Sequence, residues 1–276
     1  MDRIRLIASD MDATLLDEQS QLPADFEETI HALAELGIRF APASGRPLYT
    51  LEAMFPTLQD ELVFIGDNGG AIRWKGQNLF TSEMSPEGWR ALNRLTREQG
   101  DIAVLCGLES AYVERPFAVH DAVLRHFYTK IEYVDRLEDV AAPADKFTIY
   151  LPQHNAQQAY DTVYASKRSI YSVAVAGECW VDIMNPGVHK GAALQTLGQL
   201  WGLPSESIMA FGDTYNDAEM LQTVRYGFLM ENGSEPLRQK VPFLAPSHRE
   251  AGVMQVLHRV LAQNGCVCPE DFVPAH

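Results

Sequence analysis

Residues 5–18 read RLIASDMDATLLDE, and this stretch joins an apolar strand to two aspartates that follow it directly. The apolar part ends at Ala8, and Asp10 and Asp12 come next with one residue between them. Two carboxylates this close repel each other unless a cation neutralises them. The stretch therefore predicts a strand that ends at a site for positive charge.

Strands and helices alternate along both ends of the chain. Such alternation predicts an α/β fold with a doubly wound, mainly parallel, Rossmann-like sheet. Helix 252–264, with apolar residues on one face, is the last element we expect. The expected strands are 4–9, 38–44, 62–69, 207–213, 226–230 and 243–247, and the other helices are 22–37, 46–58, 189–202, 216–224 and 235–241.

The middle of the chain has a different order of elements. A hairpin is expected around residues 107–110, a strand at 145–152 and a strand pair across 171–184. This order predicts an antiparallel sheet with helices on one face. We expect an α+β domain of residues 82–186 inserted into a core domain made of residues 1–81 and 187–276.

Composition narrows the class of partner. The chain has 276 residues and a formal net charge of −15, which opposes binding to nucleic acid but leaves a small anionic substrate open. No apolar run is long enough for a membrane span, and no signal-peptide pattern is present at the N-terminus. The four scattered cysteines predict reduced thiols. We expect a cytoplasmic protein that is a monomer or a weak homodimer.

Polar residues gather just after the predicted core strands, where ligands bind in open α/β sheets. Asp10, Asp12, Asp213 and Asp217 would bring about four negative charges together, and a hard divalent cation such as Mg²⁺ would neutralise them. Three further residues supply the hydrogen-bond donors and positive charge that a phosphate needs: Ser44, Lys190 and Asn216. The sequence therefore predicts a magnesium site beside a phosphate site.

These motifs resemble those of a known superfamily. DMDATLL (10–16), ASGRP (43–47), HKG (189–191) and FGDTYNDAEML (211–221) stand in the order and spacing of the four motifs of the haloacid dehalogenase superfamily. The insertion between the second and third motifs resembles the C2 cap of its Cof-type phosphatases. The resemblance covers essentially the whole chain, and it implies a phosphatase of small phosphorylated metabolites such as sugar phosphates, nucleotides or phosphorylated cofactors.

The resemblance also implies the catalytic roles. Asp10 would be the nucleophile that forms an aspartyl-phosphate, and Asp12 the general acid and then the general base. Magnesium would be held by the Asp10 carboxylate, the Asp12 backbone carbonyl and Asp213, with Asp217 ordering the outer shell.

Other positions follow the family pattern with one departure. Ser44, Lys190 and Asn216 would hold the phosphoryl oxygens, and Thr14 would support the loop. Arg46, which matches the family's SGR, would also belong to the phosphate site. The family usually has glycine where this chain has Ala13. If that position requires a positive φ, alanine costs roughly 1 kcal/mol or more in local strain.

Alternative interpretations remain. Taken alone, the DxD pair is a common loop sequence, Ser44 is a helix cap, Lys190 is a surface charge and residues 212–217 are a turn. The whole chain is also compatible with a phosphomutase of the same superfamily, or with a non-catalytic regulatory protein that binds phosphorylated metabolites. In the inserted domain, Tyr112, Glu178 and Asn185 are candidates to face the cleft.

Overall fold

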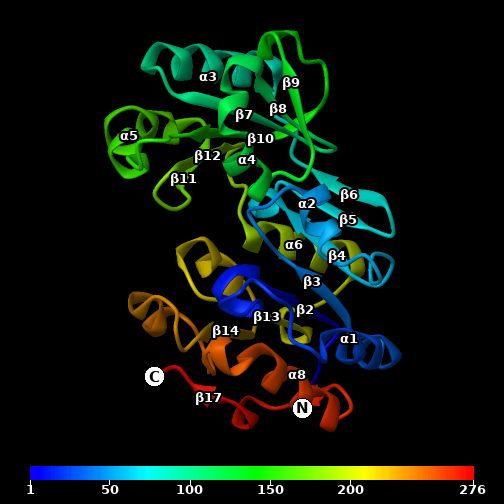
Figure 1. The fold of residues 1–276 in the computed structure, drawn as a ribbon. Coiled ribbons are helices and arrows are strands. Elements are labelled where there is room, and N and C mark those ends of the chain that lie inside the picture. Colours follow the sequence, from blue (N-terminus) through cyan, green and yellow to red (C-terminus); the bar gives the residue numbers. More distant parts are fainter.

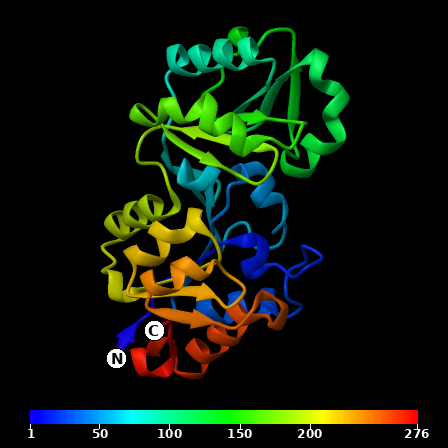
Figure 2. The same cartoon turned by 90° about the vertical axis from the view of Figure 1, so that its left-hand side faces the viewer.

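The fold is described from a computed structural model that covers residues 1–276. Two bodies are stacked on each other (Figure 1), and the view from the side shows the same division (Figure 2). The lower body contains both termini, and the upper body is formed by the middle of the chain. Each body is built on its own six-stranded sheet.

The sheet of the lower body has the strand order β17-β15-β14-β13-β2-β3. All neighbouring strands in it are parallel except β17, which runs antiparallel to β15. Its strands are β2 (Leu6–Ser9), β3 (Arg39–Pro42), β13 (Ile208–Gly212), β14 (Tyr226–Met230), β15 (Phe243–Ala245) and β17 (Val273–Pro274).

Helices cover both faces of this sheet because successive residues of each strand point to opposite sides. In β2, Ile7 packs against α1 (Phe26–Glu35) and α8 (Gly252–Ala262). Leu6 and Ala8 point the other way, against α6 (Lys190–Trp201) and α7 (Ala218–Thr223). The predicted doubly wound α/β class is confirmed.

Two expectations for this body were wrong in detail. Residues 62–69 do not form a full strand of the parallel sheet, because β4 (Val63–Gly66) is joined to it only by the isolated bridge Ala43–Ile65, just beyond the end of β3. Instead β4 pairs antiparallel with β5 (Ala71–Trp74), which pairs with β6 (Gln77–Thr81). The short helix α2 (Leu48–Ala53) packs beside β4.

The second error concerns the C-terminus, which does not end at helix 252–264. After α8 the chain adds β16 (Cys266–Val267) beside β1 (Asp2–Arg3), and then β17. Phe272 packs on Tyr226, Phe228 and Phe243 of the sheet. Burial of the Phe272 ring stabilises the C-terminal segment against the sheet. The segment is too short for its sequence to show a strand pattern.

The upper body has the strand order β11-β12-β10-β7-β8-β9. Its pairs are antiparallel except β8–β9, which are parallel because the helix α4 connects them. The elements are α3 (Pro86–Gln99), β7 (Ile102–Gly107), β8 (Ala111–Glu114), α4 (Asp121–Phe127), β9 (Ile131–Val134), β10 (Ala144–Tyr150), α5 (Ala156–Thr162), β11 (Ser172–Val175) and β12 (Trp180–Met184).

We expect the helices of the upper body to lie on one face of its sheet, and this prediction is wrong: they lie on both faces. Trp89 of α3 and Ala156 of α5 pack on one side of the sheet with Phe147. Leu124 of α4 packs on the opposite side with Val104. That second face, partly covered by α4, is the one that contributes to the cavity described below.

The chain passes between the two bodies twice, through residues 82–85 and 185–189. Asn185 joins these crossings, since its side-chain amide donates to the backbone carbonyls of Ser82 and Glu83 at 3.2 and 2.8 Å. All four cysteines are free, in agreement with the expected thiols. The chain contains no helix with both the length and the apolar character needed to cross a membrane.

One carboxyl group is buried without a partner where the two bodies meet. The Asp145 side chain, on β10, is fully buried and neither of its oxygens has a hydrogen-bond partner. A Cβ atom at Gly70 would lie 2.9 Å from one of those oxygens. Burial, reinforced by the charge of Asp67, raises the pKa of Asp145 well above its ordinary value. The folded protein therefore favours the neutral form of this group.

A pH dependence of stability follows from the raised pKa. Above about pH 4 the unfolded chain ionises Asp145 while the folded chain does not, so stability falls as pH rises until the folded pKa is passed. We expect Asp145→Asn to become more stable than the wild type by roughly 1–3 kcal/mol between pH 4 and 7. Urea unfolding across this range measures the difference. For the exposed control Asp161→Asn, the difference from the wild type in the free energy of unfolding should stay constant with pH. The same constant difference for Asp145→Asn would contradict the prediction.

Candidate active site

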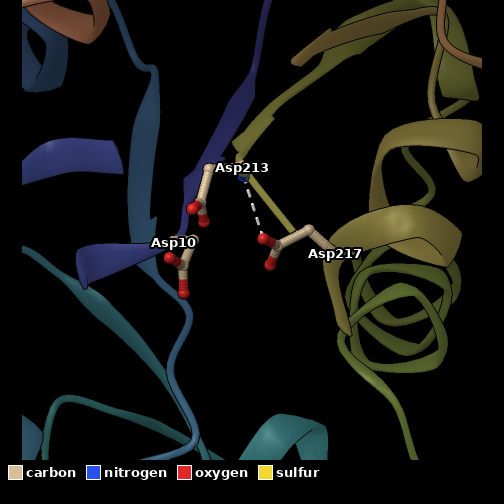
Figure 3. Close-up of side chains that lie close together, drawn as sticks. All are labelled: Asp10, Asp213 and Asp217. Carbon is tan, nitrogen blue, oxygen red and sulfur yellow. Dashed lines mark hydrogen bonds between the residues drawn. The ribbon is translucent and has the colours of Figure 1, made fainter. Parts of the chain in front are cut away.

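Three carboxylates converge at one edge of the core sheet (Figure 3). Asp10 follows β2 and Asp213 follows β13, and the two strands are parallel neighbours, so their carboxyl ends lie side by side. Asp217 reaches the same point from the turn before α7. One oxygen from each of the three side chains lies within 4.8 Å of the others.

A buried lysine meets two of these carboxylates. Lys190 is the first residue of α6 and is fully buried. Its ammonium group donates to Asp217 at 2.7 Å and also to Asp10. Lys190 is therefore not a solvated surface charge, which is the usual state of a lone lysine. The helix start supplies backbone N–H groups that favour negative charge at the same place.

The charges in this cluster do not balance. Burial raises the pKa of the Asp10 carboxyl to about 8, an effect that Lys190 opposes and Asp217 strengthens. Burial and the charge of Asp217 also raise the pKa of Asp213 to about 6. Although burial disfavours its charged form, Asp10 and Asp217 raise the pKa of Lys190 above its ordinary value. One ammonium group therefore faces three carboxyl groups, which leaves room for a further positive charge.

The turn that follows β13 is held by its own side chains. Asp217 accepts hydrogen bonds from the backbone N–H groups of Asp213 and Thr214, at 3.0 and 3.2 Å. Gly212 makes this possible, because a Cβ atom there would lie 2.4 Å from the Cβ of Asp217. The turn predicted for residues 212–217 is present, and it fixes two of the carboxylates at the same time.

The loop after β2 contains Ala13, the position where the family usually has glycine. Ala13 has a φ of 58°, in the left-handed region that favours glycine. Its carbonyl accepts a hydrogen bond from Asn232 at 2.9 Å, and Thr14 donates to Asp213 at 3.5 Å. The condition under which alanine costs stability is thus met.

We expect Ala13→Gly to stabilise the protein by up to ~1 kcal/mol, because glycine adopts a positive φ without the steric penalty. Urea unfolding measures the change. The matched control is Ala34→Gly, at an exposed position inside α1, where glycine should cost about 1 kcal/mol. Equal losses in the two variants would show that the loop does not strain Ala13.

Asp12 and Arg46 form a pair beside this loop. The Arg46 guanidinium donates to both Asp12 oxygens, at 2.9 and 3.2 Å, and the Asp12 side chain is 58% exposed. The Asp12 carboxylate is therefore not part of the three-carboxylate cluster. Ser44 is buried, and its hydroxyl accepts from the backbone N–H of Arg46 at 3.1 Å.

A cavity of about 390 Å³ opens between the two bodies at this point. Its core side carries six of the predicted site residues, whereas Lys190 and Asp217 lie behind it, within the carboxylate cluster. The six residues at the cavity surface are Asp10, Asp12, Ser44, Arg46, Asp213 and Asn216.

The upper body contributes residues that sequence reasoning did not select. Thr148 and Asp182 line the cavity together with Trp180, whereas Tyr112, Glu178 and Asn185 do not. A signal for them was available in the sequence. Along β10 and β12, Thr148 and Asp182 alternate with apolar neighbours on the other face, and they are paired across the two strands.

The sequence matches a family model as a whole. The model describes haloacid dehalogenase-like hydrolases and aligns with residues 7–257. The chain belongs to the haloacid dehalogenase-like hydrolases. This confirms the superfamily that the four motifs indicated, and with it the prediction of an enzyme that acts as a hydrolase.

Two relatives in this family carry more specific names. The chain is 31% identical over 262 residues to the 5-amino-6-(5-phospho-D-ribitylamino)uracil phosphatase YbjI of Escherichia coli, covering 94% of this chain and 96% of that protein. It is 30% identical over 250 residues to the HMP-PP phosphatase of Cronobacter sakazakii, covering 87% and 89%. Similarity to these phosphatases extends over both bodies.

A solved structure has the same fold. A protein from Streptococcus mutans UA159 superposes with a TM-score of 0.84 at 28% identity, covering 94% of this chain and 99% of that one. The fold that the two proteins share thus includes the upper body as well as the core.

Proposed function

We propose that this chain is a magnesium-dependent phosphatase that hydrolyses small phosphorylated metabolites through an aspartyl-phosphate on Asp10. The observation that carries the proposal is the buried cluster of Asp10, Asp213, Asp217 and Lys190 at the edge of the cavity. Such a cluster combines a nucleophile, a cation site and a fixed positive charge within reach of one phosphoryl group.

The donor set fits a hard divalent cation. Three carboxylates lie close together and one ammonium group contacts two of them, and oxygen ligands are those that Mg²⁺ prefers. Asp10, the Asp12 carbonyl and Asp213 would hold the ion, and Asp217 would order its surroundings. When bound, Mg²⁺ neutralises charge on the carboxylates and the phosphoryl oxygens, so that the anionic nucleophile and the anionic substrate can approach.

In the first step, an oxygen of Asp10 attacks the phosphorus atom and the bond from phosphorus to the leaving oxygen breaks. Asp12 gives its proton to that oxygen, and the alcohol departs. In the second step, Asp12 takes a proton from water, and the water oxygen attacks the phosphorus atom of the aspartyl-phosphate. The bond between phosphorus and Asp10 then breaks, which releases inorganic phosphate and restores both carboxyl groups.

Arg46 has a positioning role in this scheme. Its bidentate pair with Asp12 keeps that side chain at the cavity and outside the buried cluster. For Asp12 to protonate a leaving group, its carboxyl must exchange some of these contacts for the substrate oxygen. Arg46 would then be released to contact the substrate, in line with its predicted place in the phosphate site.

Ser44, Asn216 and Lys190 would hold the phosphoryl oxygens. Ser44 and Asn216 line the cavity from loops that follow β3 and β13. Lys190, fixed between two carboxylates, supplies positive charge without needing to reorient. Preorganised charge of this kind is worth far more in a closed site than in water.

We assign residues 82–186 as a cap domain that closes over the phosphoryl group. Its face carries Phe127, Trp180 and Asp182 at the cavity, opposite the carboxylates. A closed cap excludes bulk water from phosphoryl transfer and contacts the leaving group. The boundaries fall in the two crossings between the bodies.

Release of inorganic phosphate from a panel of phosphorylated metabolites, with Mg²⁺ and with EDTA, tests the proposal. The first compound to assay is 5-amino-6-(5-phospho-D-ribitylamino)uracil, because the name of the relative that is 31% identical gives this compound as its substrate. We expect hydrolysis that requires Mg²⁺. Isomerised sugar phosphate without release of phosphate would indicate a mutase, and a lack of turnover of every compound, p-nitrophenyl phosphate included, would indicate a binding protein.

A further inference from the structure

The cavity is larger than a phosphate group requires. Its volume of about 390 Å³ lies in the range of sites that hold whole metabolites. The catalytic residues occupy one end, and the upper body forms the other. The residues at that second end are therefore placed to contact the leaving group of a phosphate ester.

Asp182 is the one carboxylate at this end. It is buried, with its exposed part on the cavity, and one oxygen accepts from the Thr148 hydroxyl at 2.6 Å. The other oxygen accepts from the Asn68 amide at 3.3 Å. A carboxylate has acceptor capacity for about four hydrogen bonds, so Asp182 still has acceptor positions for a ligand.

Lys146 also lines the cavity, but two carboxylates compensate its charge. The Lys146 ammonium donates to the Gly45 carbonyl at 2.6 Å, lies 2.9 Å from Asp67 and 3.5 Å from Asp182. Its single positive charge therefore stands between two carboxylates. A ligand at this end thus meets an acceptor that is already positioned, beside a cation whose charge two carboxylates compensate.

An aromatic wall stands beside Asp182. The Trp180 ring packs against Phe127 with centroids 5.0 Å apart and against Tyr150 at 4.6 Å. Trp180 and Phe127 both line the cavity. The Trp180 and Phe127 ring planes are inclined at 65° to each other, so their packing forms a rigid apolar corner.

Hydrogen bonds connect this end of the cavity to the phosphate end. Asn68 donates to Asp182 from its amide nitrogen, and its oxygen accepts from the Asn216 amide at 3.5 Å. Asn68 is itself held in a left-handed conformation with a φ of 54°. A contact made at Asp182 is therefore continuous with a residue proposed to hold the phosphoryl group.

Resting on the proposed phosphatase activity, we infer that Asp182, positioned by Thr148 and Asn68, determines which leaving group the enzyme accepts. The preferred leaving group is uncharged, donates O–H or N–H hydrogen bonds to Asp182, and carries a flat ring that packs on Trp180 and Phe127. A carboxylate or second phosphate at the same position is disfavoured, because it would face Asp182 with a like charge.

The charge preference is tested with two substrates that differ in one group. Sorbitol 6-phosphate ends in a hydroxymethyl group where 6-phosphogluconate has a carboxylate. We expect the full-length protein with Mg²⁺ to show a kcat/KM at least ~10-fold higher for sorbitol 6-phosphate, and Asp182→Asn to reduce that ratio by about tenfold. The matched control Asp161→Asn, on an exposed part of α5, should keep the wild-type ratio.

The ring preference is tested in the same way with uridine 5′-monophosphate and ribose 5-phosphate. We expect the wild type to favour the nucleotide by about tenfold, and Trp180→Leu to lose most of this preference. Thr148→Val should reduce the sorbitol 6-phosphate preference in the same direction as Asp182→Asn, and it provides the test if Asp182→Asn does not fold.

The outcomes separate this inference from the proposed function. Hydrolysis of p-nitrophenyl phosphate, with no wild-type preference within either pair, would overturn the inference and leave the phosphatase standing. Folded Asp182→Asn protein with an unchanged ratio would also overturn it, because a purely structural role lowers both rates together. If no compound is hydrolysed, the proposed phosphatase function itself is contradicted, and the inference that rests on it fails with it.

Discussion

Asp10→Asn is expected to lower phosphate release at least ~10³-fold, the largest effect of any single change in this protein. The carboxamide has nearly the shape of the carboxylate but does not attack phosphorus as a nucleophile. Without the nucleophile no aspartyl-phosphate forms, so rapid-quench assays with Mg²⁺ and excess substrate should show no burst of alcohol release. Steady-state release of phosphate from p-nitrophenyl phosphate gives the simplest measurement.

The matched control is Asp60→Asn, an aspartate exposed in the loop after α2 of the core. It should retain wild-type rates. Circular dichroism and the melting temperature of Asp10→Asn establish that the fold is intact. Residual activity within about tenfold of the wild type in folded Asp10→Asn would mean that another group attacks phosphorus, and the proposed mechanism would fail.

Lys190→Met is expected to reduce the free energy of unfolding by about 3–5 kcal/mol in addition to removing activity. The methionine fills much of the same volume, but Asp10 and Asp217 lose the ammonium group that both contact. Buried carboxylates without a cation cost far more than a lost surface pair. Urea unfolding in EDTA measures the effect, and added Mg²⁺ should recover part of the stability if the ion binds the same carboxylates.

Two further variants isolate the cause of the stability loss. Lys240→Met, at an exposed lysine of the core, should change stability by less than about 0.5 kcal/mol. Asp217→Asn in the Lys190→Met background removes one uncompensated charge and should restore part of the loss. Wild-type stability of Lys190→Met would contradict the importance of charge at this position.

The sequence was enough to predict the core sheet and the convergence of its polar residues. Parallel strands place their carboxyl ends at one edge, so Asp10 after β2 and Asp213 after β13 had to lie close together. It was less informative for weak or short pairings. Residues 62–69 join a separate hairpin, and the last strands depend on burial of Phe272, which no local pattern announces.

The upper body illustrates the other limit. The sequence indicated its strands, but Tyr112, Glu178 and Asn185 proved to be the wrong candidates for the cavity. Alternation in β10 and β12 separates two faces and does not say which face meets the core. That choice depends on contacts such as Lys146 with Asp67, between segments far apart in the chain.

By itself, the sequence determined where strands and helices form and which residues follow each core strand, because backbone geometry and apolar periodicity act over a few residues. Tertiary structure alone decided that Ala13 takes a left-handed conformation and that Lys190 is buried between Asp10 and Asp217. It also decided that Asp182 and Trp180 face the cavity. These features depend on how separately formed sheets dock and exclude water, which is a property of packing across the whole chain.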